Sequence, residues 1–264
     1  MKVITKELAP TKALLQIEDT GAYFVNSLRR VMLSDLPKLA IEDVIIYDNT
    51  SPLFDEVIAH RLSLIPIPTD LKLLTFRSLC TCKGSGCPSC TVRYTLSKEG
   101  EGIVYSGDLQ PEEKSWVIKE DTIPIVELFK EQRIILEVEA VLGRGRDHAK
   151  WQAVQAPGYK FYPIVEIDQK KCTACNKCIE ACPKRILEMK NKKLVVTDIE
   201  QCTTCKSCVD ICETDAITVS DDEHRFLFRF ETDGSLSTKE VLQESVAILA
   251  KKYEEFGALL KKQK

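Results

Sequence analysis

The twelve cysteines of this 264-residue chain fall into three tight groups, at residues 80–90, 172–182 and 202–212. Cysteine thiolates bind zinc and iron–sulfur clusters, and grouped cysteines in a reducing compartment favour metal binding over disulfide bonds. The chemistry that this sequence offers is therefore metal coordination by sulfur.

Two of the groups have the spacing of a bacterial two-cluster ferredoxin. Residues 172–183 read C-x2-C-x2-C-x3-C-P, and residues 202–213 repeat this spacing with Glu213 in place of the proline. In that pattern three cysteines of one run share a cluster with the last cysteine of the other run. We expect two [4Fe–4S] clusters, one bound by Cys172, Cys175, Cys178 and Cys212, the other by Cys202, Cys205, Cys208 and Cys182. Two tetrahedral zinc sites are the alternative, although zinc rarely uses a crossed repeat.

The third group reads C-x-C-x4-C-x2-C and consists of Cys80, Cys82, Cys87 and Cys90. Gly84 and Gly86 allow a tight turn between its two halves. Four thiolates in one loop suit a closed structural zinc site, in which metal binding contributes to folding. The alternative is a loop without metal, either reduced or paired by disulfides.

Other classes of function have little support in the sequence. No phosphate-binding glycine loop, nucleophile constellation or Asp-rich magnesium motif is visible, so we expect no catalytic residues. The formal net charge of −3 does not favour nucleic-acid binding. The N-terminus lacks the apolar core of a signal peptide, and no apolar run approaches the roughly 18 residues that span a bilayer. We expect a cytoplasmic protein that does not contact membranes.

Hydrophobic periodicity and turn residues predict the elements around these cysteines. A hairpin is expected over 3–8 and 13–17, followed by a helix that starts near 19–21 and stops at Pro37, and by a strand over 39–47. Further strands are expected at 91–96, 134–142 and 224–231, with a short helix near 54–62. The stretch 164–220 repeats with a period of about thirty residues as cysteine loop, short helix and strand.

A long terminal helix is predicted after Gly234. Ser237 and Glu240 have the spacing of a capping box. An apolar seam then follows the helix in alternating four- and three-residue steps, a pattern typical of coiled coils, at Leu242, Val246, Leu249, Tyr253, Phe256 and Leu260. We expect the seam to pack against a partner helix. The alternative is that it packs on the sheet of its own chain.

Several segments outside the cysteine repeat resemble one protein family. They are Phe-Val-Asn-Ser-Leu-Arg-Arg at 24–30, Asn-Thr-Ser-Pro-Leu-Phe-Asp-Glu at 49–56, Ala-His-Arg-Leu-Ser-Leu-Ile at 59–65, Gly-Arg-Gly-Arg-Asp-His-Ala-Lys-Trp at 143–151 and Phe-Glu-Thr-Asp-Gly-Ser-Leu at 230–236. Together they resemble the alpha-like assembly subunits of multisubunit RNA polymerases. The ferredoxin-like insert excludes the bacterial alpha subunit and makes the chain similar to the archaeal members of this family, the D subunits of archaeal DNA-directed RNA polymerase.

The resemblance implies an α+β fold with a split assembly domain. Residues 1–47 and 222–264 would form that domain, residues 48–163 an inserted mixed β domain, and residues 164–221 an inserted two-cluster ferredoxin-like domain. The cysteine loop at 80–90 resembles the zinc loop of the third-largest subunit of eukaryotic polymerase II.

The resemblance also implies a function and partners. The chain would be a non-catalytic subunit that pairs with a small alpha-like subunit, L, through the two helices described above. With the small subunits N and P it would support the large catalytic subunits in transcription. Asn26, Arg29 and Arg30 match the motif of the first helix and would contact the second-largest subunit, although for Arg29 and Arg30 a solvated helix face is the alternative. A two-cluster electron-transfer protein or redox enzyme subunit is the alternative for the whole chain.

Overall fold

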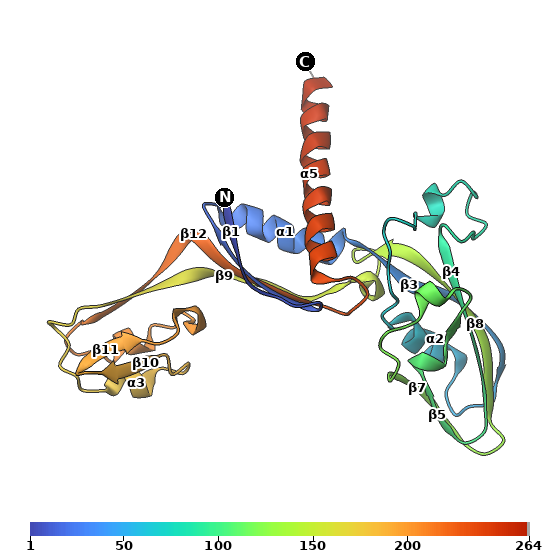
Figure 1. Cartoon of the computed structure of the whole chain (residues 1–264), viewed down its shortest axis with the longest axis horizontal. Helices are drawn as coiled ribbons and strands as arrows, with labels where there is room; N and C mark the ends of the chain where they lie inside the picture. Colours follow the sequence, from blue (N-terminus) through green and yellow to red (C-terminus); the bar gives the residue numbers. More distant parts are fainter. Residues whose placement is uncertain (263–264) are drawn as a thin grey trace. The chain divides into compact units, whose positions relative to one another are not determined.

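A computed structural model describes residues 1–262 of the chain (Figure 1). The chain divides into two compact units, which are described separately. Unit 1 comprises Met1–Lys6, Leu14–Asn26 and Gly158–Arg229, and unit 2 comprises Glu7–Ala13, Ser27–Pro157 and Phe230–Lys264. Among the described residues, no helix combines the length and apolar character needed to cross a bilayer.

One four-stranded sheet joins segments from both ends of the sequence. Its strand order is β1-β2-β12-β9, with bounds Lys2–Leu8, Lys12–Glu18, Ile217–Thr232 and Val154–Ile167. Strand β2 buries alternate residues Ala13, Leu15 and Ile17, because successive side chains of a strand point to opposite faces. The predicted N-terminal hairpin and the strand at 224–231 are confirmed, and β12 is longer than expected.

Helix α1 spans Ala22–Ser34 and buries Val25, Leu28, Val31 and Met32 at helical spacing. It ends before Pro37, which is the first residue of β3 (Pro37–Asn49). A residue that precedes proline is driven out of the helical region, which explains the boundary. The predicted helix and its stop are confirmed.

The second four-stranded sheet lies within unit 2 and is antiparallel. Its order is β3-β8-β4-β6, in which β8 spans Arg133–Arg144, β4 Thr91–Glu99 and β6 Gln110–Pro111. The short strands β5 (Gly102–Tyr105) and β7 (Pro124–Leu128) pair with each other in a separate two-stranded sheet. Helix α2 spans Asp55–Ser63. A single core of aliphatic residues, Tyr94 and Trp116 fills this part of the unit. The predicted strands at 91–96 and 134–142 and the helix near 54–62 are confirmed.

The Gly/Arg segment at 143–148 begins in the last two residues of β8 and packs against the end of α1. A Cβ atom on Gly145 would lie 2.0 Å from the carbonyl oxygen of Leu33, so only glycine fits there. The Arg146 amide donates to the Ser34 carbonyl at 3.1 Å, and its guanidinium pairs with Asp35 at 3.0 Å. Arg144 stacks over the ring of Phe76 at 4.4 Å. The segment therefore has a structural role that accounts for its residue types.

The cysteine repeat folds within unit 1 as two similar copies. The first contains α3 (Lys177–Ala181) and β10 (Leu187–Lys190), the second contains α4 (Ser207–Asp210) and the start of β12. Strand β10 pairs with β11 (Lys193–Val196) through a two-residue turn whose residues both have positive φ, 50° and 59°, as a tight hairpin requires. The predicted order of cysteine loop, short helix and strand is confirmed.

Helix α5 spans Thr238–Lys262 and is drawn as one uninterrupted helix in Figure 1. The capping box is confirmed, because Glu240 accepts the Ser237 amide at 2.9 Å and Ser237 Oγ accepts the Glu240 amide at 3.4 Å. Thr238 Oγ1 donates to the Ala9 carbonyl at 2.7 Å, and Lys252 pairs with Asp35 at 2.7 Å. These contacts hold α5 to two other segments of unit 2, one at the start of the helix and one just past its middle.

Candidate metal centres and partner surface

Two pockets in the cysteine repeat are lined by thiols from both copies. We call them the 202 pocket and the 172 pocket after their first cysteines. The 202 pocket is lined by Cys182, Cys202, Cys205 and Cys208. The 172 pocket is lined by Cys172, Cys175, Cys178 and Cys212. In each pocket three cysteines of one run therefore meet the last cysteine of the other run.

The backbone of the two cysteine loops is alike and explains how the thiols converge. Ala174 and Asn176 flank Cys175 with φ of 55° and 65°, and Thr204 and Lys206 flank Cys205 with φ of 51° and 61°. Left-handed residues alternating with others turn successive amide groups toward one side, which forms a concave anion-binding backbone. Each loop is therefore shaped to surround a negatively charged group.

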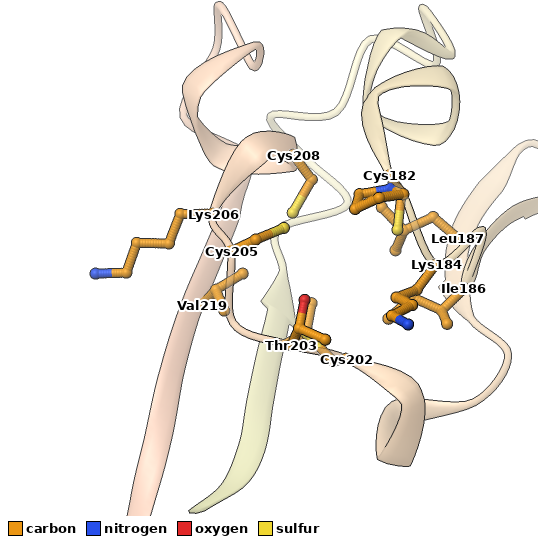
Figure 2. A pocket seen from close by; sticks show the side chains of 12 residues that line it. Cys182, Lys184, Ile186, Leu187, Cys202, Thr203, Cys205, Lys206, Cys208 and Val219 are labelled. Atoms are coloured by element: carbon orange, nitrogen blue, oxygen red, sulfur yellow. The ribbon is translucent and has the colours of Figure 1, made fainter. Parts of the chain in front are cut away.

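The 202 pocket is the more apolar of the two. Figure 2 shows Cys182 on one side of the pocket and Cys205 with Cys208 on the other. Val165, Ile186, Leu187 and Val219 contribute to the walls. Burial raises the pKa of Cys208 to about 11, since an ionised thiol is disfavoured in apolar surroundings. A bound metal would have to provide the compensating positive charge.

The 172 pocket carries more polar groups at its rim. Cys212 Sγ accepts the Ala216 amide at 3.3 Å, and this hydrogen bond lowers the pKa of Cys212. Lys177 pairs with Glu213 at 2.5 Å. Glu213 stands where the ferredoxin pattern has proline, so at this position an ion pair between the two copies replaces a rigid turn. Both pockets supply four soft thiol ligands around a hollow, and these residues fit a cubane cluster.

The third cysteine group forms a tight tetrad in unit 2. The Sγ atoms of Cys80, Cys82, Cys87 and Cys90 all lie within 4.8 Å of one another. Individual Sγ–Sγ distances are 3.5 Å for Cys80–Cys87, 3.6 Å for Cys82–Cys90 and 3.9 Å for Cys87–Cys90. A zinc–sulfur bond of about 2.3 Å corresponds to a tetrahedron edge of about 3.8 Å. The four residues therefore fit a tetrahedral zinc ion.

Two arginines hold the tetrad loop against the neighbouring sheet. Arg77 donates to the Gly84 carbonyl at 3.2 Å and Arg93 to the Gly86 carbonyl at 3.3 Å. Both guanidinium groups also bind the carboxylate of Glu139, each at 2.9 Å. Glu139 lies on β8, so the loop is fixed to the sheet from outside the thiol set. No sequence motif indicated these three residues.

The electrostatics of the tetrad are uneven. A backbone hydrogen bond from Cys87 lowers the pKa of Cys82 to about 5. Burial raises the pKa of Cys90 to about 11. The loop thus supplies one readily ionised thiol, Cys82, and one thiol, Cys90, that ionises only beside a positive charge. A metal ion bound among the four thiols would provide that charge.

The predicted partner seam on α5 divides into a covered and an uncovered part. Leu249 is only 7% exposed and belongs to the core of its own chain, and Leu242 is half-buried. The other four seam residues are exposed and lie on either side of Leu249 in the sequence, and Leu259, which the seam pattern omitted, is exposed too. The exposed seam residues are Val246, Tyr253, Phe256 and Leu260, at 48%, 58%, 60% and 52%.

None of the three residues of α1 that were predicted to contact the second-largest subunit is fully buried. Asn26 and Arg29 are half-buried, whereas Arg30 is exposed. The Arg30 carbonyl accepts the Ser34 hydroxyl at 2.8 Å within the helix.

Comparison with known proteins agrees with these features. Residues 44–168 match a family model described as the RNA polymerase Rpb3/RpoA insert domain, and residues 164–213 match a 4Fe-4S dicluster domain. DNA-directed RNA polymerase subunit Rpo3 of Methanosphaera stadtmanae is 42% identical over 96% of both chains. The Rpo3 proteins of Methanothermobacter thermautotrophicus and Methanosarcina acetivorans are 43% and 41% identical, over 97% and 98% of both chains. The chain therefore belongs to the Rpo3 family of DNA-directed RNA polymerase subunits.

Proposed function

We propose that the chain is a non-catalytic assembly subunit that pairs with the small alpha-like L subunit and so forms the platform for the large catalytic subunits. The observation that carries this proposal is the exposed part of the apolar seam on α5, at Val246, Tyr253, Phe256 and Leu260. Contiguous exposed apolar surface is rare on monomeric proteins and is typical of interaction sites. A partner helix that continues the alternating steps would cover the seam.

The exposed part of the seam contributes moderately to pairing. Its four side chains are each about half exposed in the chain alone. Full burial of one such side chain is worth roughly 1.5–3 kcal/mol, so covering the remaining halves gives roughly 3–6 kcal/mol for the four. Association costs at least about 4 kcal/mol. Stable pairing therefore needs a second surface, for which the resemblance supplies α1.

The split assembly domain, made of residues 1–47 and 222–264, has support from strand pairing. Strand β12, late in the sequence, is hydrogen-bonded in one sheet beside the N-terminal strand β2. Residues 48–163 and 164–221 would then be insertions into a domain built from the two ends, and β9 (Val154–Ile167), which crosses the boundary between them, would add a strand to the sheet of that domain. Asn26, Arg29 and Arg30 of α1 would contact the second-largest subunit, and the small subunits N and P would join the same platform.

We also propose the metal content of the chain. Cys172, Cys175, Cys178 and Cys212 would hold one [4Fe–4S] cluster, and Cys182, Cys202, Cys205 and Cys208 another. The grouping of these thiols around two pockets supports that assignment. One zinc ion at Cys80, Cys82, Cys87 and Cys90 is supported by their Sγ spacing. The two clusters and the zinc ion would cross-link the cysteine loops that bind them. Metal binding would therefore contribute to the folding of these loops.

Co-expression with the small alpha-like subunit of the same organism tests the assembly role. Size-exclusion chromatography with light scattering should show an equimolar heterodimer, and the chain expressed alone should aggregate or self-associate. A chain that is monodisperse alone and does not bind this partner would overturn the proposal. The electron-transfer alternative would then gain support. At present it is not favoured, because the similarity to Rpo3 proteins covers nearly the whole chain.

A further inference from the structure

A lysine outside the cysteine repeat holds the backbone of one cluster-binding loop. Lys160 lies on β9 and donates to the carbonyl oxygen of Glu200 at 2.5 Å and to that of Cys202 at 2.8 Å. Glu200 belongs to the short 3-10 turn Ile199–Gln201, which leads directly into Cys202. The lysine therefore fixes the point at which the chain enters the 202 pocket.

The same turn is held by a second lysine on another strand. Lys6 of β1 pairs with the Glu200 carboxylate at 2.7 Å. Within the turn, the Asp198 side chain accepts the Glu200 amide at 3.1 Å. Both β1 and β9 belong to the four-stranded sheet. The first ligand of the 202 pocket is thus tied to that sheet by two separate contacts.

The equivalent turn of the first copy is tied differently. Asp168 takes the place of the capping aspartate and accepts the Lys170 amide at 2.9 Å. Gln169 then donates to the carbonyl oxygen of Leu194 at 2.7 Å, and Leu194 lies on β11 inside the repeat. The turn before Cys172 is therefore held within the repeat, whereas the turn before Cys202 is held by the sheet.

We propose that Lys160 is a positioning residue for the cluster of the 202 pocket, and that retention of this cluster depends on the sheet that carries Lys160. The inference rests on the two-cluster assignment proposed above. Contacts outside the ligand set orient metal ligands, and their loss typically lowers affinity by about 10–100-fold. The ammonium group also places a positive charge beside a ligand set whose thiolates are negative, which favours the bound state.

Single-cluster variants of the full chain make the test specific. Replacing both Cys172 and Cys175 with alanine leaves only the 202 pocket with a complete ligand set. Replacing both Cys205 and Cys208 leaves only the 172 pocket. The measurement is the rate at which anaerobically reconstituted protein loses its visible absorbance to a ferrous-iron chelator. Lys160→Met should speed this loss at least about tenfold when only the 202 pocket is complete and should not change it when only the 172 pocket is complete.

Two further variants separate positioning from charge and from misfolding. Lys190 on β10 is exposed and lines neither pocket, so Lys190→Met removes a charge from the repeat and should leave the rate unchanged. Lys160→Gln keeps a donor and should fall between Lys160→Met and the parent. If Lys160→Met fails to give the parent's circular-dichroism spectrum, Lys160→Gln serves as the test, and a rate equal to that of the parent would overturn the proposal.

The outcomes distinguish this inference from the assignment on which it rests. A parent protein that takes up no iron when only the 202 pocket is complete would overturn the two-cluster assignment itself. A parent that binds a cluster, with Lys160→Met releasing it at the same rate, would overturn only the positioning role. Equal acceleration in both single-cluster proteins would also overturn it, because that result indicates a general loss of stability.

Discussion

Phe256→Asp should abolish pairing of the chain with the small alpha-like subunit. Phe256 is 60% exposed on α5, so the substitution leaves the core of the chain intact. In the heterodimer it removes roughly 1 kcal/mol of remaining apolar burial and places an unpaired carboxylate in the seam, at a cost of about 3–5 kcal/mol. The sum of about 4–6 kcal/mol corresponds to at least about a 1000-fold increase in Kd.

A matched control is available two residues away. Ala258 is exposed on the same helix, and 3.6 residues per turn place it about 200° around the axis from Phe256. Ala258→Asp adds the same charge at nearly the same height and should change Kd less than about threefold. Co-expression with a tagged partner, followed by measurement of the fraction of chain that stays bound at decreasing concentrations, gives both values without isolating the chain, and the visible absorbance of the clusters should be unchanged in both variants.

The reasoning is refuted if Phe256→Asp binds the partner within about threefold of the parent chain. It is also refuted if the two variants lose affinity equally, because the effect would then come from charge on the helix and not from the seam. Leu249 is unsuitable for this test. It lies in the core, so a charge there would destabilise the chain with or without a partner.

Three further predictions concern the metal sites and the core. Cys182→Ala should halve the iron content. Adding a cysteine substitution in the 172 pocket should then remove the remaining iron, whereas adding one in the 202 pocket should not. Loss of the remaining iron on adding a substitution in the 202 pocket would contradict the crossed assignment. Cys87→Ser should release the zinc ion measured by elemental analysis while leaving iron and labile sulfide unchanged, and a parent chain that folds without zinc would contradict the site. Asp233→Asn should lower the free energy of unfolding by about 3–5 kcal/mol, because it leaves the buried ammonium of Lys38 unpaired. The control Asp43→Asn, at an exposed ion pair, should lower it by less than about 1 kcal/mol, and urea titration measures both values.

The elements that sequence periodicity predicted are those governed by local rules. The capping box at Ser237 and Glu240 forms because a serine and a glutamate three residues apart satisfy free amides wherever a helix starts. The end of α1 before Pro37 follows from sterics within one dipeptide. The two ligand sets of the repeat could also be predicted from the sequence. The spacing of the first three cysteines is fixed within each loop, and the exchange of the last cysteine between the two runs is part of the ferredoxin pattern.

The features that the sequence did not reveal depend on contacts between distant segments. The seam of α5 marks an apolar stripe, but periodicity does not say what covers each part of it, so Leu249 and Phe256 carried the same prediction although one is buried and the other exposed. Lys160 binds backbone carbonyls about forty residues away, and such contacts require no particular residue type at the acceptor. Arg77 escaped notice because its carboxylate partner, Glu139, lies 62 residues away in the sequence.

Affinity purification of the full-length chain from the cells that produce it, with quantitative mass spectrometry of the proteins that remain bound, tests the assembly role most directly. An assembly subunit should carry the small alpha-like subunit and both large catalytic subunits in equimolar amounts, and the Phe256→Asp chain should lose all of them together. Recovery of the parent chain alone, or with redox enzymes in place of polymerase subunits, would contradict the proposed function.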